Sequence, residues 1–513
     1  MASQVDTRTD VGSPPDGALR LIPHYIAGAR TEGQPGGQGQ VFQPSSGRAL
    51  AQVVYASEAD VDRAVAASKR AQPGWADHSL SRRTEVLFAF RELLRRHQKE
   101  LASEITAQHG KVLSDAQGEV ARGIENVEYA CGLATHLRGG HSEEVSTGVD
   151  VHEVLQPLGV AAGISPFNFP VMVPLWMLAN AIACGNGFVL KPSEKDPGPA
   201  LMLAELFVEA GLPEGVFNVI QGDRVAVQRL LHHPDVAAIS FVGSTPVAKE
   251  IYRVAAEQGK RVQALGGAKN HMVVLPDADL GAAADAAVSA AYGSAGERCM
   301  AVSVVVAVGP IADPLVQAIK ERIESLRVGP GEEAASEMGP LVTEAHRDRV
   351  ASYIDRGQKE GAAVVVDGRR QQFEGEGFFL GASLLDRVEE GMSVYKDEIF
   401  GPVLGVVRAK SFEEALAVVN RNPYGNGVAI FTRDGGAARI FARRVEAGMV
   451  GINVPIPVPV GYYSFGGWKN SLFGASHIYG PQGIGFYTRA KVITSRWPDP
   501  SQSRIDLGFP ETR

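Results

Sequence analysis

The feature that most restricts the fold is a regular alternation of short apolar runs and helical patterns between residues 158 and 265. Runs rich in β-branched residues predict strands, and the segments between them carry apolar side chains at helical spacing. We expect strands at 159–164, 188–191, 216–220 and 237–242, with helices at 173–184, 199–210, 225–231 and 247–256. This alternation is typical of a parallel sheet with crossover helices, so the region is predicted to be a doubly wound, Rossmann-like unit.

The turn after the strand that ends at Val242 is a candidate phosphate site. In Gly243-Ser244-Thr245-Pro246, Ser244 or Thr245 can cap the following helix and Pro246 suits its first position. Free amides at such a helix end favour an anion. Most junctions of this kind only begin a helix, and the turn is not a G-x-G-x-x-G fingerprint, so by itself it leaves both roles open.

A second α/β region is predicted from about Lys269 to Gly451. Its expected helices are 281–292, 314–326, 344–360, 412–420 and 437–445, and its expected strands are 302–308, 363–366 and 427–431. Two strand-like pieces, 145–156 and 487–495, lie outside both regions. Because unpaired strand edges aggregate, pairing with another subunit is a natural arrangement for these pieces.

Charge and hydropathy argue against nucleic-acid and membrane roles. The formal net charge is −8 and no long basic run is present, which disfavours binding to phosphate backbones. The longest apolar stretch, residues 170–184, is interrupted by Pro174 and Asn180 and falls short of the ~20 residues that a bilayer span needs. Residues 1–20 lack a signal-peptide core and are expected to be a disordered leader. We therefore expect a cytoplasmic protein with no membrane or nucleic-acid partner.

The chain has three cysteines, Cys131, Cys184 and Cys299. Their odd number and wide spacing argue against disulfides and against a zinc site, so we expect a reducing compartment and no bound metal. A lone cysteine is usually a small buried hydrophobe, and we expect that of Cys131 and Cys184. Cys299 instead lies between a Gly-Ser-Ala-Gly turn and a β-branched strand, beside Arg298, whose charge can favour a thiolate.

Several short motifs, taken together, resemble the aldehyde dehydrogenase superfamily over residues 24–497. They are Ser165-Pro166-Phe167-Asn168-Phe169-Pro170, Lys191-Pro192-Ser193-Glu194, Phe241-Val242-Gly243-Ser244, Gly296-Glu297-Arg298-Cys299, Glu398-Ile399-Phe400-Gly401-Pro402 and Phe465-Gly466-Gly467. The resemblance implies the α/β aldehyde dehydrogenase fold, with a Rossmann-like NAD-binding domain, an α/β catalytic domain and a small β oligomerisation element.

The same resemblance implies domain boundaries and an assembly. The NAD-binding domain is expected to comprise residues 21–142 and 159–268, the catalytic domain residues 269–462, and the oligomerisation strands residues 143–158 and 484–500. A homotetramer, built as a dimer of dimers, is expected from the family and from the two spare strand-like pieces.

A more specific resemblance is to the CoA-acylating branch of the superfamily, which acts on methylmalonate semialdehyde. It is carried by Cys299-Met300-Ala301, by Ala268-Lys269-Asn270-His271 and by the C-terminal run from Tyr479 to Trp497. This resemblance implies NAD as the cofactor and CoA as a co-substrate.

Two catalytic residues follow from the resemblance. Cys299 is expected to attack the aldehyde carbon, and the Asn168 side chain, with the Cys299 backbone N–H, is expected to stabilise the resulting oxyanion. Loss of one such donor typically costs about 3 kcal/mol of transition-state stabilisation. A purely structural role for Asn168, as a turn residue before Pro170, remains the alternative.

The cofactor residues also follow from family positions. Lys191 and Glu194 come just after a predicted strand, at the end where open α/β sheets bind ligands. A carboxylate facing the adenosine ribose repels a 2′-phosphate, so Glu194 favours NAD over NADP. The remaining cofactor positions are Ser165 and Phe167, Gly243 and Ser244 at the pyrophosphate, and Glu398 and Phe400 at the nicotinamide riboside. An exposed ion pair of Lys191 with Glu194, and a solvated loop charge at Glu398, are the structural alternatives.

One family feature is missing. Alignment from Lys269 places Leu265 where hydrolytic members hold a glutamate base, and Gln263, Ala264 and Gly266 beside it are not acids either. Since a general base typically contributes about 10²–10⁴-fold, a thioacyl enzyme without one should react slowly with water and leave CoA to intercept it. An alignment error, or another residue such as Glu297 acting as base, stays open.

Substrate recognition is expected to involve Arg122 and Arg298, which match arginines associated with the branch. A guanidinium suits the carboxylate of a semialdehyde. For Arg122 a helical surface pair with Glu119 or Glu125, three residues away on either side, is an equally good explanation.

These observations predict NAD-dependent, CoA-acylating oxidation of methylmalonate or malonate semialdehyde to propionyl-CoA or acetyl-CoA, with loss of CO₂ or bicarbonate. The sequence does not choose between the two substrates. A hydrolytic semialdehyde dehydrogenase that releases a free acid is the first alternative. A non-enzymatic binding or structural protein with the same fold is the second, although the presence of Cys299, Asn168 and Glu398 argues against it.

Overall fold

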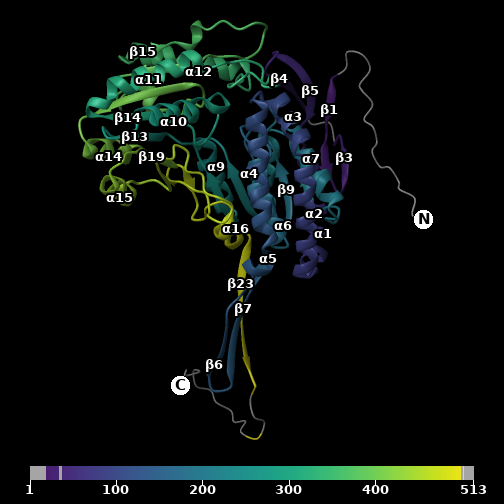
Figure 1. Ribbon diagram of the computed structural model, residues 1–513. Coiled ribbons are helices and arrows are strands. Elements are labelled where there is room, and N and C mark those ends of the chain that lie inside the picture. Colours follow the sequence, from purple (N-terminus) through teal and green to yellow (C-terminus); the bar gives the residue numbers. More distant parts are fainter. Residues whose placement is uncertain (1–18, 34–36, 498–500, 502–513) are drawn as a thin grey trace.

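The computed structural model describes residues 19–33, 37–497 and 501. The leader expected within residues 1–20 therefore lies outside the described part of the chain, apart from Leu19 and Arg20. Two α/β lobes lie side by side and a narrow arm of strands projects from them (Figure 1). The sequence prediction of an α/β architecture is confirmed.

An eight-stranded sheet forms the centre of the first lobe, in the order β22-β12-β11-β8-β9-β10-β2-β3. Its five inner strands run parallel: β8 (Val160–Ile164), β9 (Gly187–Lys191), β10 (Phe217–Val219), β11 (Val236–Val242) and β12 (Arg261–Leu265). Antiparallel strands β2 (His24–Ile26), β3 (Ala29–Thr31) and β22 (Leu472–Phe473) extend its two edges. Every residue of β8 and β9 is buried, as expected for strands covered on both faces.

Helices cover both faces of this sheet. The crossover helices are α6 (Met172–Ala183), α7 (Gly198–Glu209), α8 (Arg224–His232) and α9 (Thr245–Glu257), each close to its predicted range. The N-terminal helices are α1 (Glu58–Asp77), α2 (Leu80–Arg96), α3 (Gln98–His109), α4 (Leu113–Cys131) and the short α5 (Leu133–His136). A small sheet of β1 (Arg20–Ile22), β5 (Arg48–Val54) and β4 (Gln38–Gln43) flanks them.

The order of the parallel strands creates a crevice between β8 and β11. The chain leaves β8 toward β9 and β10, then returns to the opposite side of β8 for β11 and β12. The loops after β8 and β11 therefore diverge above the carboxyl end of the sheet, where doubly wound folds bind ligands.

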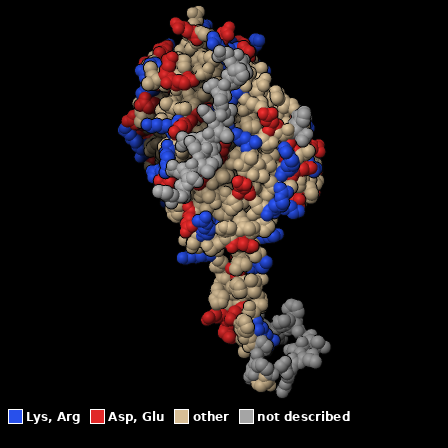
Figure 2. All heavy atoms as spheres, turned by 90° about the vertical axis from the view of Figure 1, so that its right-hand side faces the viewer, with Lys and Arg blue, Asp and Glu red and all other residues tan. Residues whose placement is uncertain are grey.

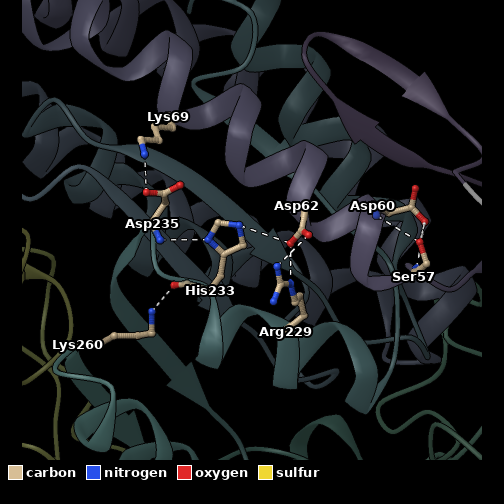
Figure 3. A network of polar contacts seen from close by, with 8 residues as sticks. All are labelled: Ser57, Asp60, Asp62, Lys69, Arg229, His233, Asp235 and Lys260. Atoms are coloured by element: carbon tan, nitrogen blue, oxygen red, sulfur yellow. Dashed lines mark hydrogen bonds and ion pairs between the residues drawn. The ribbon is translucent and has the colours of Figure 1, made fainter.

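Polar contacts fasten the amino end of β11, at the opposite edge of the sheet (Figure 3). Arg229 of α8 donates two hydrogen bonds to Asp62 of α1, at 2.6 and 2.8 Å. The His233 ring lies 3.5 Å from Asp62 and accepts the Asp235 N–H with Nδ1, and the Lys260 ammonium donates to the His233 carbonyl. The network joins α1, α8 and β11 on the side away from the crevice, so we assign it a structural role.

The second lobe is built on a seven-stranded sheet in the order β15-β16-β17-β14-β13-β19-β20. Its strands are β13 (Asn270–Val274), β14 (Val302–Val308), β15 (Ala363–Val366), β16 (Ser383–Asp386), β17 (Val403–Ala409), β19 (Gly427–Phe431) and β20 (Met449–Ile452). All neighbours are parallel except β15 and β16. The helices are α10 (Leu280–Tyr292), α11 (Ala312–Ser325), α12 (Glu344–Glu360), α13 (Ser393–Lys396), α14 (Phe412–Arg421) and α15 (Gly435–Arg444).

The arm differs from the prediction. The element expected at 145–156 is two strands, β6 (His141–Ser146) and β7 (Val149–Pro157), joined by a tight turn in which Gly148 has φ +67°. That left-handed conformation suits glycine and folds the chain back on itself. β7 also pairs with β23 (Thr488–Arg496), so the two spare pieces partner each other within one chain. The short helix α16 (Gly480–Phe486) leads into β23, and β18 (Tyr424–Gly425) pairs with β21 (Trp468–Lys469).

The outer surface agrees with the charge pattern of the sequence. On the face shown in Figure 2, basic and acidic side chains are interspersed over the body and the arm. Within the part of the chain that the structure describes, none of the helices combines the length and apolarity that a bilayer crossing needs.

Candidate active site

A cavity of about 250 Å³ opens where the carboxyl end of the first sheet meets the second lobe. Its walls come from the loop after β8, the turn after β11, the loop after β12, the segment before β14, the helix α12 and the segment after α13. The lining residues are Pro166, Phe167, Asn168, Val242, Gly243, Ser244, Gly266, Gly267, Cys299, His346, Arg349, Glu398 and Phe400. The fold thus brings both predicted catalytic residues and several predicted cofactor residues to one place.

The backbone of Cys299 is held by two asparagines. Asn270 Nδ2 donates to the carbonyls of Cys299 and Ala301, both at 2.9 Å, and Asn270 Oδ1 accepts the Gly427 N–H at 3.0 Å. Asn426 Nδ2 adds a longer bond of 3.3 Å to the same Cys299 carbonyl. From the sequence, Asn270 was noted only as part of a family motif and Asn426 was missed. The residues around these two asparagines contain no local pattern that predicts a contact with a distant backbone carbonyl.

The turn before the nucleophile has a strained backbone. Ser294 and Ala295 have φ values of 53° and 52°, a left-handed conformation that non-glycine residues rarely adopt. Gly296 follows with φ +75°, and a Cβ there would lie 2.3 Å from the Gly401 carbonyl oxygen. Strain of this kind persists only where the surrounding structure imposes it, and here it presents Cys299 to the cavity.

The Cys299 thiol is only partly exposed, and its surroundings keep it protonated. Burial raises the pKa of the thiol to about 12, and the charge of Glu398 adds to that effect. Arg298 acts in the opposite direction, as the sequence suggested, but weakly. Its guanidinium is bonded to Asp115, with Nη2 and Oδ1 2.7 Å apart. Ionisation of Cys299 therefore needs a base or a change in its surroundings.

Asn168 lies in the loop between β8 and α6, with its side chain almost fully buried. Its carbonyl accepts a hydrogen bond of 2.6 Å from the Lys111 ammonium. Because Asn168 and Cys299 line the same cavity, a side-chain amide and a nucleophile are available to one substrate carbonyl.

The acidic side chains near Cys299 differ in whether they line the cavity. Leu265 ends β12, packs into the core of the first lobe and is not part of the cavity lining. Glu297 is fully buried and is not among the lining residues, with Oε1 3.3 Å from the Val342 amide and 3.4 Å from the ring of the lining residue His346. Burial raises the pKa of Glu297 to about 8. Glu398 is the carboxylate among the lining residues.

Glu398 has a defined orientation. Its Oε1 accepts the Ala268 N–H at 2.9 Å, and a side chain at Gly267 would collide with Oε2. Burial raises the pKa of Glu398 to about 7, although the Ala268 bond and the Lys269 ammonium act against this. A carboxyl group titrating near neutrality can accept or donate a proton in the cavity.

The two residues predicted to contact the adenosine ribose form a pair at the carboxyl end of β9. Lys191 Nζ lies 3.0 Å from Glu194 Oε2, and the Glu194 side chain is 38% exposed. Burial pushes the Glu194 pKa upward, but Lys191 and hydrogen bonds outweigh it, so its pKa is lowered and the group is ionised. Ser165 lies beside the pair because its amide donates to the Lys191 carbonyl.

The turn after β11 leaves the N-terminus of α9 without a side-chain cap. Ser244 is the N-cap of α9 but its hydroxyl makes no capping bond, and Pro246 occupies the second helical position rather than the predicted first. Thr245 instead accepts the Gly267 N–H, at 2.8 Å. An uncapped helix N-terminus at this crevice fits an anionic group such as the pyrophosphate of NAD. Phe167 and Phe400 meet edge to face nearby, with ring centroids 5.8 Å apart.

Arg122 and Arg298 are not brought together on this cavity. Arg122 donates to Glu125 at 2.7 Å and to the Pro459 carbonyl at 3.0 Å, while Arg298 pairs with Asp115. The helical surface pair of Arg122 with Glu125, which was the alternative to a substrate-binding role for Arg122, is therefore present. A guanidinium has five N–H donors, so both side chains retain further donors for a ligand.

Comparison with known proteins agrees with this geometry. The sequence profile of the aldehyde dehydrogenase family matches residues 31–493. The malonate-semialdehyde dehydrogenase of Pseudomonas aeruginosa is 53% identical over 491 residues, covering 95% of this chain and 99% of that protein. Malonate-semialdehyde dehydrogenase 1 of Geobacillus thermodenitrificans is 48% identical over 480 residues, covering 93% of this chain and 99% of that protein.

Solved structures give the same result. A protein of Sinorhizobium meliloti 1021, assigned as a methylmalonate-semialdehyde dehydrogenase and complexed with NAD, superposes with a TM-score of 0.94 at 50% identity. The alignment covers 95% of this chain and 100% of that structure. The methylmalonate-semialdehyde dehydrogenase of Oceanimonas doudoroffii gives a TM-score of 0.93, also at 50% identity, with 94% and 99% covered.

Proposed function

Since the chain belongs to the aldehyde dehydrogenase family, we propose that it catalyses NAD-dependent, CoA-acylating oxidation of malonate or methylmalonate semialdehyde. The observation that carries the proposal is a cavity that holds Cys299 and Asn168 at the crevice of the first sheet, with Leu265 in place of a glutamate base. The names of the relatives supply the two candidate substrates.

The first half-reaction uses residues of the cavity lining. The Cys299 sulfur attacks the aldehyde carbon, and the Asn168 amide and the Cys299 backbone N–H stabilise the oxyanion. Glu398, with a pKa raised to about 7, can accept the thiol proton. Donors fixed in advance lower the barrier because no reorganisation is needed as charge develops.

The structure fits NAD at the crevice, because uncapped amides and close glycine backbone line it. Bound NAD⁺ would supply the acceptor for the hydride, leaving a thioester on Cys299. The residues that would hold it are Lys191 and Glu194 at the adenosine ribose, Gly243 and Ser244 at the pyrophosphate, Glu398 and Phe400 at the nicotinamide riboside, and Ser165 and Phe167 alongside. The ionised Glu194 carboxylate favours NAD over NADP.

The second half-reaction transfers the acyl group to CoA. The β-carboxylate departs as CO₂, which water can convert to bicarbonate, because the thioester carbonyl stabilises the developing enolate. The enolate carbon then takes up a proton from solvent, which leaves an acetyl or propionyl thioester on Cys299. The CoA thiol then attacks the thioester and regenerates Cys299. Arg122 and Arg298 are proposed as ligands of the substrate carboxylate before it leaves. Acetyl-CoA follows from malonate semialdehyde and propionyl-CoA from its methylated relative.

Product identification by mass tests the proposal. Purified protein with NAD, CoA and either semialdehyde is expected to form NADH and acyl-CoA together, and NADH formation should slow strongly when CoA is left out. Fast NADH formation with free acid and without CoA would instead support the hydrolytic alternative, with Glu398 as its base. Full turnover by Cys299→Ala would refute the catalytic assignment.

Assembly, location and domain boundaries belong to the same proposal. We propose a homotetramer, a dimer of dimers, in which the exposed edges of β6 and β23 meet other subunits. Val492 and Trp497 support this, since they leave apolar side chains 60% and 77% exposed on the arm. Light scattering in solution tests the subunit number. Three cysteines without a disulfide suit the cytoplasm.

The proposed domains keep the ranges given by the sequence. They are an NAD-binding domain at 21–142 and 159–268, a catalytic domain at 269–462, and oligomerisation strands at 143–158 and 484–500. Residues 34–36 and 498–500 of these ranges lie outside the described part of the chain.

A further inference from the structure

We propose that charged residues at the start of α4 position the oxyanion-binding groups on both sides of the substrate. Asp115 and Glu119 are four residues apart on one face of α4, and Lys111 lies just before the helix. Lys111 and Glu119 hold the loop that carries Asn168, and Asp115 holds the residue before Cys299. The inference rests on the proposed function, because it concerns the geometry of that reaction.

The Asn168 loop is fixed by one buried ion pair. Lys111 Nζ donates to Glu119 Oε2 at 2.8 Å and to the Asn168 carbonyl at 2.6 Å, and both side chains of the pair are fully inaccessible to solvent. Glu119 Oε1 accepts the amides of Val171 and Met172, at 2.8 and 3.1 Å. The pair therefore contacts the loop at Asn168 and again at the start of α6.

The Cys299 side is fixed from the same helix. Asp115 Oδ1 accepts from Arg298 Nη2 at 2.7 Å. Burial pushes the pKa of Asp115 upward, but the charges of Arg298 and Lys111 and the hydrogen bonds to Asp115 together lower it. The guanidinium lies directly against Gly293, where a Cβ would be 2.5 Å from Nη1. Arg298 shares a peptide unit with the Cys299 N–H, so Asp115 limits the movement of that donor.

Stability alone does not explain the Lys111–Glu119 pair. Taking two charges out of water costs about as much as their attraction returns, and well-packed apolar residues are often as stable. Here burial raises the pKa of Glu119 despite Lys111 beside it. What an apolar pair cannot supply is a cation bonded to the Asn168 carbonyl and an acceptor for two amides. A positioning role accounts for these directed contacts.

A double-mutant cycle between Lys111 and Asn168 tests the proposal, with NADH formation measured in the full-length enzyme. Lys111→Met should lower kcat on the order of 10²-fold with little change in KM, because displacements near 1 Å at a reacting centre cost that much. In an Asn168→Ala background, Lys111→Met should cause no further loss, since its effect acts through Asn168. Glu119→Gln, which keeps the side-chain size, is measured in the same cycle in case Lys111→Met folds poorly.

Arg83→Met is the matched control. Arg83 is also buried and also donates to a carbonyl of the α6 segment, that of Ala183, at 2.8 Å, but at the end far from Asn168. Its replacement should lower the melting temperature while leaving kcat unchanged. Alkylation of Cys299 by iodoacetamide builds no oxyanion, so its rate should be the same in Lys111→Met as in the wild type.

Three outcomes would overturn the positioning role. They are additive losses of kcat in the Lys111 and Asn168 variants, a fall in kcat for Arg83→Met equal to that of Lys111→Met, and a matching fall in Cys299 alkylation. Failure of the proposed function looks different: the wild type would then form no NADH with malonate semialdehyde, methylmalonate semialdehyde or propanal, or would form NADH and free acid rapidly without CoA. Normal wild-type turnover with an additive cycle refutes only the inference.

Discussion

Replacement of Asn270 should damage both stability and catalysis, because one buried side chain satisfies three backbone groups. Its amide nitrogen serves the carbonyls of Cys299 and Ala301, and its oxygen serves the Gly427 amide. Asn270→Ala removes all three bonds, although Asn426 still reaches the Cys299 carbonyl. A buried polar group left unsatisfied costs about 1–3 kcal/mol, so the two groups without that support should cost about 2–6 kcal/mol of unfolding free energy.

The catalytic effect follows from the same bonds. In Asn270→Ala the Cys299 carbonyl loses its bond of 2.9 Å and keeps only the 3.3 Å bond from Asn426. The backbone that carries the nucleophile is then held less firmly. We expect kcat to fall on the order of 10²-fold. The affinity for NAD should stay unchanged, because Asn270 is not among the residues lining the cofactor cavity.

Urea unfolding and steady-state kinetics of three variants check this reasoning. Asn426→Ala is the control, since it loses only the longer bond to Cys299 and a contact with Met300 Sδ. Asn270→Asp keeps the acceptor for Gly427 but places an oxygen against two carbonyls, so it should be as unstable as Asn270→Ala. A loss below 1 kcal/mol for Asn270→Ala, or an equal loss for Asn426→Ala, would contradict the assignment.

Three further predictions concern titratable groups. Burial raises the pKa of the Cys299 thiol to about 12 and the charge of Glu398 adds to this effect, so the rate of Cys299 alkylation, followed by mass spectrometry, should still increase above pH 9. Glu398→Gln should move this pH profile to lower pH. An inflection near pH 7 in the wild type would contradict the prediction. The pKa of Glu297 is raised from 4.5 to about 8, so folding favours its protonated form and the unfolding free energy should fall as pH rises from 5 to 8. Glu297→Gln should remove that part of the slope in urea titrations, and an unchanged slope would exclude the buried proton. Glu194→Gln should favour NADP: kcat/KM for NADP divided by kcat/KM for NAD should rise on the order of 10-fold, which corresponds to about 1.4 kcal/mol. An unchanged ratio would show that the carboxylate does not face the ribose.

The local patterns of the sequence predicted five helices of the second lobe but only three of the seven strands of its sheet, and β13, β16, β17 and β20 were missed. Helix 344–360 and strands 363–366 and 427–431 were placed at their observed bounds, since apolar periodicity is set by near neighbours. The arm was missed as a hairpin because β-propensity continues through 145–156, and only the turn at Gly148 separates the strands. The pairing of β7 with β23 joins segments too distant for any local pattern to predict.

The sequence by itself determined the chemistry of the chain: a cysteine after a glycine-rich turn, an asparagine after a strand, and no acid at Leu265. The tertiary structure decided what each side chain faces. It left Glu297 out of the cavity lining, paired Arg298 with Asp115 across 183 residues, and joined Lys111 to Asn168 across 57. Such contacts depend on where whole helices and loops pack, because side-chain direction is fixed by the fold rather than by neighbouring residues.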